Sequence, residues 1–77
     1  MRAKIFLDGD FLVGELDDGR RLSHSDAESL ADLLWTHGVT SAQVLMIDWH
    51  QDAARAPMSG QRIAIYQRLR LHEQSEG

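Results

Sequence analysis

The sequence predicts a small α+β domain: one antiparallel β-sheet, in β-β-β-α-β-β order, with one amphipathic helix packed on one face. Two Asp-Gly pairs, Asp8-Gly9 and Asp18-Gly19, divide the first part of the chain into short apolar runs, as the turns of β-hairpins do. Residues 26–37 carry apolar side chains at helical spacing, and residues 42–49 and 61–71 have strand-like patterns. A single sheet covered by the helix is the simplest layered arrangement of these elements.

The first three strands are expected at residues 2–7, 10–16 and 20–23. We expect Asp8-Gly9 at the centre of a type I′ turn, which needs positive φ at both central positions. Gly14 inside a strand indicates a bulge or a close neighbour. Alternation groups the side chains of the first two strands by face: Ala3 with Ile5 and Leu7, Phe11 with Val13, and Leu12 with Gly14 and Leu16.

The helix is expected to begin after Ser25, because Ser25 and Glu28 have the spacing of a capping box. Gly38 suits the left-handed position that follows the end of a helix. Trp35 falls at the edge of the apolar stripe, where its ring would cover the rim of the core. The stripe consists of Ala27, Leu30, Ala31 and Leu34, with Leu33 at its flank.

Two more strands are predicted after the helix. Residues 42–49 are nearly all apolar, which is typical of a central strand covered on both faces. In residues 61–71 the apolar side chains scatter around a helix axis but share one face of a strand, so a strand is favoured. The apolar positions are Ile63, Ile65, Leu69 and Leu71, and the opposite face would carry Arg62, Tyr66, Arg68 and Arg70.

Length and composition predict one compact domain over residues 1–72, followed by a flexible C-terminal tail, residues 73–77. The chain has no cysteine, which excludes disulfides and thiolate metal sites. Its first apolar run is too short for a signal peptide, and no run approaches the ~18 apolar residues of a membrane span. We therefore expect a complete small gene product in the cytoplasm.

Catalytic chemistry has little support, and no catalytic residue is assigned. Ser23, Ser25, Ser41 and Ser59 lie at expected caps or turns, and no glycine-rich phosphate loop follows a strand. Asp48, His50 and Asp52 would share one face of a strand and are the only cluster that resembles a metal-ligand set. Three such ligands without a second cluster are more typical of a polar strand end, so no metal and no cofactor are expected. The chain is not expected to be an enzyme.

The leading hypothesis is a small non-catalytic intracellular module that recognises a protein partner. The loop of residues 49–60 carries residue types that frequently anchor interfaces, and tryptophan and arginine are the commonest among them. Trp49 could equally pack back onto the core. The loop residues assigned to partner binding are Trp49, His50, Arg55 and Met58.

Two further considerations bear on the partner. The small size of the chain, its acidic net charge and its strand-rich order of elements are common among small bacterial accessory or regulatory proteins and among phage or mobile-element inhibitors. No family motif is present.

The alternative hypothesis is a module for single-stranded nucleic acid, in which a strand face presents Arg62, Tyr66, Arg68 and Arg70. The net charge of −4 favours a solvated strand face over nucleic-acid binding. A monomer and a homodimer both remain compatible with the sequence.

Overall fold

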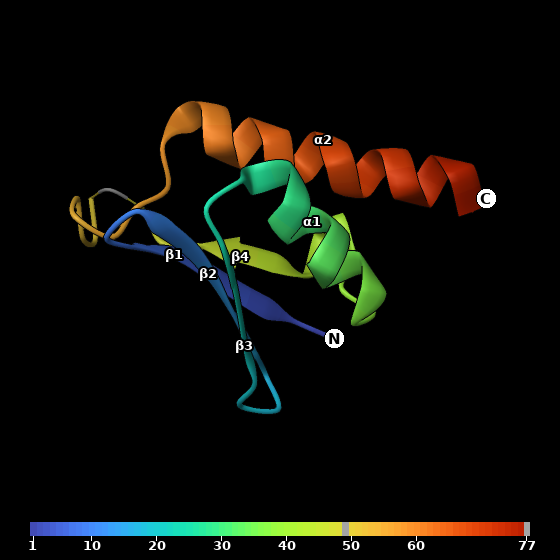
Figure 1. Ribbon diagram of the computed structural model, residues 1–77, viewed down its shortest axis with the longest axis horizontal. Helices are drawn as coiled ribbons and strands as arrows, with labels where there is room; N and C mark the ends of the chain where they lie inside the picture. Colours follow the sequence, from blue (N-terminus) through green and yellow to red (C-terminus); the bar gives the residue numbers. More distant parts are fainter. Residues whose placement is uncertain (49, 77) are drawn as a thin grey trace.

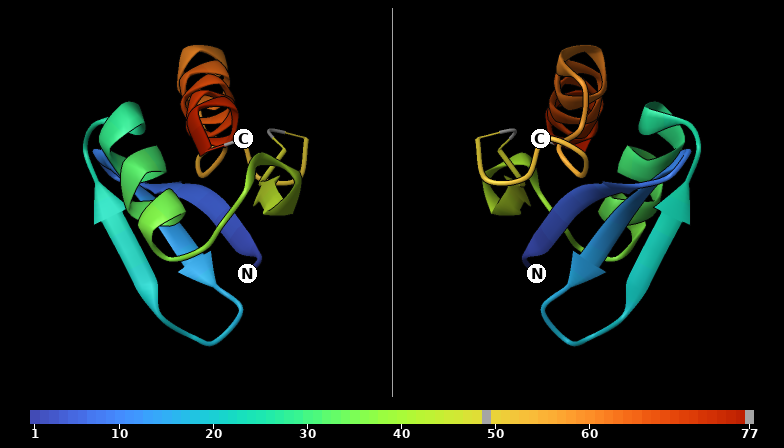
Figure 2. Two further views of the ribbon diagram at one scale, coloured as in Figure 1. Left: turned by 90° about the vertical axis from the view of Figure 1, so that its right-hand side faces the viewer. Right: turned by 90° about the vertical axis from the view of Figure 1, so that its left-hand side faces the viewer.

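The computed structural model describes residues 1–48 and 50–76 of the chain. It is a small α+β fold in which two helices pack on the same face of one four-stranded sheet (Figures 1 and 2). The elements, in chain order, are β1 (Ala3–Asp8), β2 (Phe11–Leu16), β3 (Arg21–His24), α1 (Ala27–Thr36), the short 3-10 helix η1 (Ser41–Gln43), β4 (Val44–Met46) and α2 (Ser59–Glu76).

The sheet is mixed, with the strand order β3-β2-β1-β4. The two N-terminal hairpins pair antiparallel as predicted, but β4 runs parallel to β1. The prediction of a purely antiparallel sheet is therefore wrong at this strand. The cause is α1, which carries the chain across the sheet and returns it in the direction of β1, as a crossover connection does. The predicted central strand is in fact a three-residue edge strand, and its Leu45 side chain is 66% exposed.

Both predicted hairpins are present, with one difference in turn geometry. Asp8 pairs with Phe11, so Gly9 and Asp10 form the two-residue loop, one position later than expected. Gly9 has a φ of 61°, whereas no residue other than glycine has positive φ among the described residues. Positive φ at the first loop position alone is the pattern of a type II′ turn rather than a type I′ turn. In the second hairpin Gly19 has a φ of 93°, which L-residues rarely adopt.

Helix α1 buries the predicted stripe, but its cap is Asp26 rather than Ser25. One carboxylate oxygen of Asp26 accepts hydrogen bonds from the Ser29 amide and hydroxyl, each at 2.9 Å. Gly38 follows the helix with a φ of 85°, as predicted. Gly14 has the close neighbour that its position in a strand suggested, because a Cβ there would lie 3.0 Å from Leu34 Cδ2 of α1.

The last element is a helix, so the predicted fifth strand over residues 61–71 is wrong. Helix α2 extends through Glu76 and includes most of the stretch expected to be a flexible tail. Ile65 and Leu69, four positions apart, are fully buried against the sheet and α1. Ile63 and Leu71, which a strand would have placed beside them, are 55% and 53% exposed. The alternating apolar pattern thus combines one buried helical stripe with two solvent-exposed side chains.

The apolar core lies in two layers. The larger cluster fills the space between the sheet and the two helices and contains the fully buried Ile5, Leu12, Leu30, Leu34 and Leu69. A smaller cluster of Phe6, Val13 and Ile47 lies apart from it. None of the helices among residues 1–48 and 50–76 is both long and apolar enough to cross a membrane.

Candidate functional site

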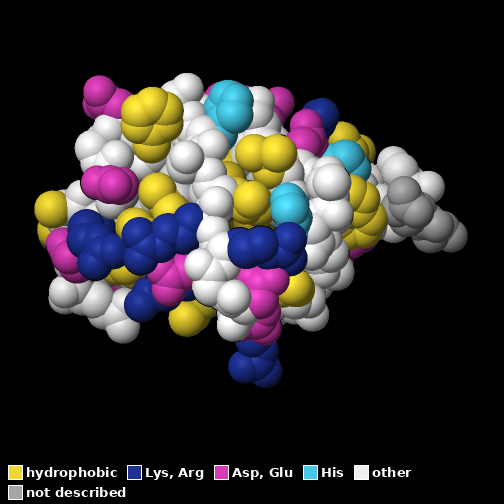
Figure 3. All heavy atoms as spheres, turned by 60° about the horizontal axis from the view of Figure 1, so that its bottom comes forward, with side chains coloured by type: hydrophobic (Ala, Val, Ile, Leu, Met, Phe, Trp, Pro, Cys, Tyr) yellow, Lys and Arg dark blue, Asp and Glu magenta, His cyan; other side chains and the backbone are white. Residues whose placement is uncertain are grey.

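The face of the sheet opposite the helices is the candidate site, and we call it the open face. Lys4 on β1 lies between Leu45 on β4 and Glu15 on β2. Glu15 in turn lies opposite Arg21 on β3, so one row of side chains crosses all four strands. By the same alternation the open face also includes Phe6, Phe11, Val13 and Ser23. Figure 3 looks toward this face and shows a band of lysine and arginine side chains with acidic and hydrophobic side chains beside it.

Arg55 covers the apolar centre of the open face. Its guanidinium carbon lies 4.4 Å from the centroid of the Phe6 ring, within the range of a cation–π interaction. The Arg55 carbonyl accepts a 2.7 Å hydrogen bond from the amide of Leu7, so the loop after β4 returns to the edge of β1. Ala56 is buried directly after it. These contacts hold the Arg55 side chain over Phe6 while leaving it exposed to solvent.

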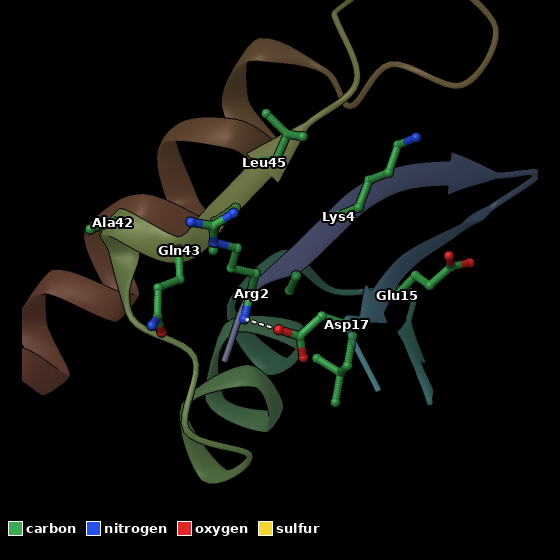
Figure 4. Close-up of a pocket in the computed structure, with 10 residues that line it drawn as sticks. Arg2, Lys4, Glu15, Asp17, Ala42, Gln43 and Leu45 are labelled. Atoms are coloured by element: carbon green, nitrogen blue, oxygen red, sulfur yellow. Dashed lines mark hydrogen bonds between the residues drawn. The ribbon is translucent and has the colours of Figure 1, made fainter. Parts of the chain in front are cut away.

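A hollow of about 440 Å³ lies at the other end of the open face, between the start of β1 and β4 (Figure 4). We call it the β1–β4 hollow. Figure 4 shows the Arg2 side chain reaching from the start of β1 toward β4. The polar residues that line it are Arg2, Lys4, Glu15, Asp17 and Gln43, and the large exposed apolar side chain beside them is that of Leu45.

The charges around this hollow are unevenly paired. Arg21 Nη2 forms an ion pair with Glu15 Oε2 at 3.0 Å, and the backbone amide of Arg2 donates to Asp17 Oδ2 at 3.4 Å. The side chains of Arg2 and Lys4, by contrast, form no ion pair or hydrogen bond within the described part of the chain. Two available cations therefore flank the exposed Leu45 side chain in a protein whose net charge is −4.

Of the four loop residues assigned to partner binding, Arg55 alone is placed on the open face by a described contact. Trp49 lies outside the described residues. His50 is exposed, and its amide donates to Asp48 Oδ1 at 3.0 Å. Met58 is 70% exposed just before α2, where its amide donates to Gln61 Oε1 at 2.9 Å.

The residues considered as metal ligands lie in turns of the loop. Asp48 accepts from the amide of His50, and Asp52 Oδ1 accepts from the amide of Ala54 at 3.2 Å. These are local turn contacts of the kind that Asp side chains commonly make. Within residues 1–48 and 50–76 no group of three or more histidine and acidic side chains is arranged to hold a metal ion.

The strand face proposed for nucleic acid is not formed, because its residues lie on α2. On a helix Arg68 no longer shares a face with Arg62, Tyr66 and Arg70, which follow one another at four-residue spacing along another side of α2. Arg68 Nε forms an ion pair with Asp32 Oδ1 of α1 at 2.8 Å. The half-buried Tyr66 hydroxyl donates to the carbonyl of Val44 at 3.5 Å, whereas Arg70 is exposed.

Asp32 ties α1 to α2 through two partners. Besides Arg68, His72 Nε2 lies 2.6 Å from Asp32 Oδ1, and the His72 ring stacks on Trp35 with centroids 5.3 Å apart. Hydrogen bonding from Arg68, followed by that from His72, lowers the pKa of Asp32 below its ordinary value. The side chains of Trp35 and His72 therefore contribute to the packing of α1 against α2.

The β1–β4 hollow was not predicted from the sequence. Lys4 and Leu45 are 41 positions apart, and only the parallel pairing of β4 with β1 brings them together. The sequence carries a weak signal for this site: Lys4 alternates with Ala3, Ile5 and Leu7 along its strand, and this alternation places it on the opposite face from them. Nothing in the local pattern around Leu45 identified it as an exposed edge residue.

No protein-family model, no curated protein and no solved structure matches this chain.

Proposed function

We propose that this chain is a small non-catalytic intracellular binding module, accessory or regulatory in role, that recognises a protein partner through the open face. The observation that carries the proposal is the position of Arg55 over Phe6. Arginine is among the residues that contribute most to protein interfaces, and a guanidinium already stacked on a ring loses less conformational freedom on binding.

The surroundings of Arg55 support a protein as the partner. Phe11 is 53% exposed and Leu45 is 66% exposed on the same face, and the buried cluster of Phe6 and Val13 lies between them. Protein interfaces are enriched in aromatic residues and arginine at their centres and have a polar rim. The open face combines these residue types, with Arg55 over Phe6 and the charged side chains of Lys4, Glu15 and Arg21 in the neighbouring row.

A non-catalytic role is favoured because the polar side chains that could take part in catalysis already make structural contacts. The His72–Asp32 contact, which has the composition of a catalytic dyad, is shared with Arg68 and belongs to the packing of α1 against α2. The carboxylates of Asp26 and Asp18 accept hydrogen bonds from nearby backbone amides, and these bonds lower the pKa of each. We expect the module to act by occupying a surface of its partner.

The test uses the tagged full chain to capture partners from an extract of its source cells, with quantitative mass spectrometry. Arg55→Ala should lower recovery of the specific partner by about tenfold or more, because such an anchor contributes ~2 kcal/mol. Arg70→Ala is the matched control, since it removes an exposed cation from α2. Equal recovery with both variants, with circular dichroism showing both folded, would remove the open face as the binding surface.

Nucleic-acid binding is the other outcome to be measured. Fluorescence anisotropy with labelled single-stranded RNA and DNA should show weak or absent binding at ~150 mM salt, because the net charge of −4 opposes a polyanion. Submicromolar binding that is weakened by Arg70→Ala and unaffected by Arg55→Ala would instead support the arginine residues of α2 as the functional ones.

A further inference from the structure

We infer that the β1–β4 hollow binds an extended acidic peptide segment of the partner, whose carboxylates meet Arg2 and Lys4 and whose aliphatic side chain packs on Leu45. This inference rests on the proposed function and specifies the chemistry of the partner at one end of the open face. It is carried by the two available cations and the exposed leucine described above.

The spacing of the two cations matches an extended chain. Arg2 and Lys4 are two positions apart in the sequence, and pairing with β2 continues to Arg2, whose carbonyl accepts from the amide of Asp17 at 3.1 Å. Their side chains therefore leave the same face of the sheet about 7 Å apart along the strand. An extended peptide also repeats its side chains every second residue at about 7 Å, so acidic residues at alternate positions would face both cations.

Leu45 provides the apolar part of the site. Leu45 on β4 pairs with Lys4 on β1, and Leu45 is 66% exposed. An isolated exposed leucine is ordinary on a protein surface, but this one borders a hollow of about 440 Å³ with a cation beside it. Burial of an aliphatic side chain against Leu45 would add affinity that attraction between exposed charges alone does not supply.

The opposite wall of the hollow favours a peptide over a nucleic acid. Glu15 and Asp17 lie there, with Glu15 held by Arg21, so the cationic strip is narrow and follows β1. Single-stranded nucleic acid is usually held by a broad basic groove together with aromatic side chains that stack on the bases. No aromatic residue of the described chain lines this hollow.

The experiment begins with selection of random displayed peptides on the immobilised full chain. Enriched peptides should carry Asp or Glu at alternate positions next to Leu, Ile or Val. One enriched peptide is then labelled, and its affinity is measured by fluorescence anisotropy. Lys4→Glu should raise Kd by about tenfold or more and reduce its salt dependence, since it replaces an attraction with a repulsion.

Two matched controls separate the hollow from general effects of charge and hydrophobicity. Arg70→Glu reverses an exposed cation on α2 and should leave the peptide Kd within about twofold. The reason is that α2 lies on the other face of the sheet from the hollow, so salt screens this charge from the peptide. Leu45→Ser should weaken binding, whereas Ile63→Ser, which changes a 55% exposed side chain on α2, should not. Circular dichroism of each variant verifies that it is folded.

The outcomes distinguish this inference from the proposed function. Peptides without acidic bias, a Kd unaffected by Lys4→Glu, or no enriched peptide would overturn the peptide site. If Arg55→Ala still abolished partner capture, the proposed function would stand and only the hollow would lose its role. Displacement of the labelled peptide by submicromolar single-stranded DNA at ~150 mM salt would assign the hollow to nucleic acid and overturn the inference.

Discussion

Truncation of Leu30 to alanine tests the packing on which the fold and the open face both depend. Leu30 is fully buried in α1, within the cluster between the helices and the sheet. The change removes three carbon groups, worth about 0.8 kcal/mol each, or about 2.4 kcal/mol in lost burial. A residual cavity of about 50 Å³ would add about 1.2 kcal/mol at ~24 cal/mol per Å³. We therefore expect Leu30→Ala to lower the free energy of unfolding by about 3–4 kcal/mol.

That loss is large for a chain of 77 residues, whose total stability at ~0.05–0.15 kcal/mol per residue is about 4–12 kcal/mol. Urea unfolding followed by circular dichroism gives the free energy by linear extrapolation. Leu71→Ala is the matched control, because the same atoms are removed from a side chain that is 53% exposed, and it should cost under about 1 kcal/mol. Equal losses for the two variants would refute the assignment of the buried helix face.

Three further predictions concern single positions. Gly14→Ala should cost about 1–3 kcal/mol in urea unfolding, because its Cβ would lie 3.0 Å from Leu34 Cδ2; an unchanged midpoint would contradict this close approach. Gly38→Ala should cost about 1 kcal/mol in the same assay because φ there is 85°, and a neutral result would argue against the left-handed helix end. The third prediction is a dependence on pH. Arg68 lowers the pKa of Asp32, so this carboxylate stabilises the fold above its unfolded pKa of ~3.9, and the contribution is lost as pH falls through the lower folded pKa. With 42% of the Asp32 side chain exposed, the effect should be under about 1 kcal/mol, and the stabilities of wild type and Asp32→Asn should converge only as pH falls below about 4; a constant difference would count against the linkage.

The hairpins and α1 were predictable because their signals are local. Glycine adopts positive φ without steric cost, so Gly9 and Gly19 mark turns wherever the rest of the chain lies. The one-sided stripe of α1 follows from helical spacing alone. Where these predictions were off by one position, as at Asp26, neighbouring residues were chemically equivalent candidates: both Asp and Ser are favoured helix caps.

Helix α2 shows why periodicity misled in the C-terminal part. Its buried stripe is narrow and consists of Ile65 and Leu69, while Ile63 and Leu71 face solvent. Together the four apolar residues occupy odd-numbered positions, and this spacing resembles the alternation of a strand. A second signal was present: the segment predicted as a strand, residues 61–71, is rich in good helix formers and, at 11 residues, is about twice as long as the ~5–6 residues of a usual strand. Length and composition were better guides here than spacing.

The sequence by itself determined the local elements whose signals lie within a few residues: two hairpins, one capped amphipathic helix, and the faces of β1 and β2. Tertiary structure decided the pairing of β4 with β1, the return of Arg55 onto Phe6, and hence the open face with its β1–β4 hollow. The physical reason is that strand pairing and side-chain contact join residues far apart in the chain. Which edge a short strand such as β4 joins depends on the packing of both helices against the whole sheet.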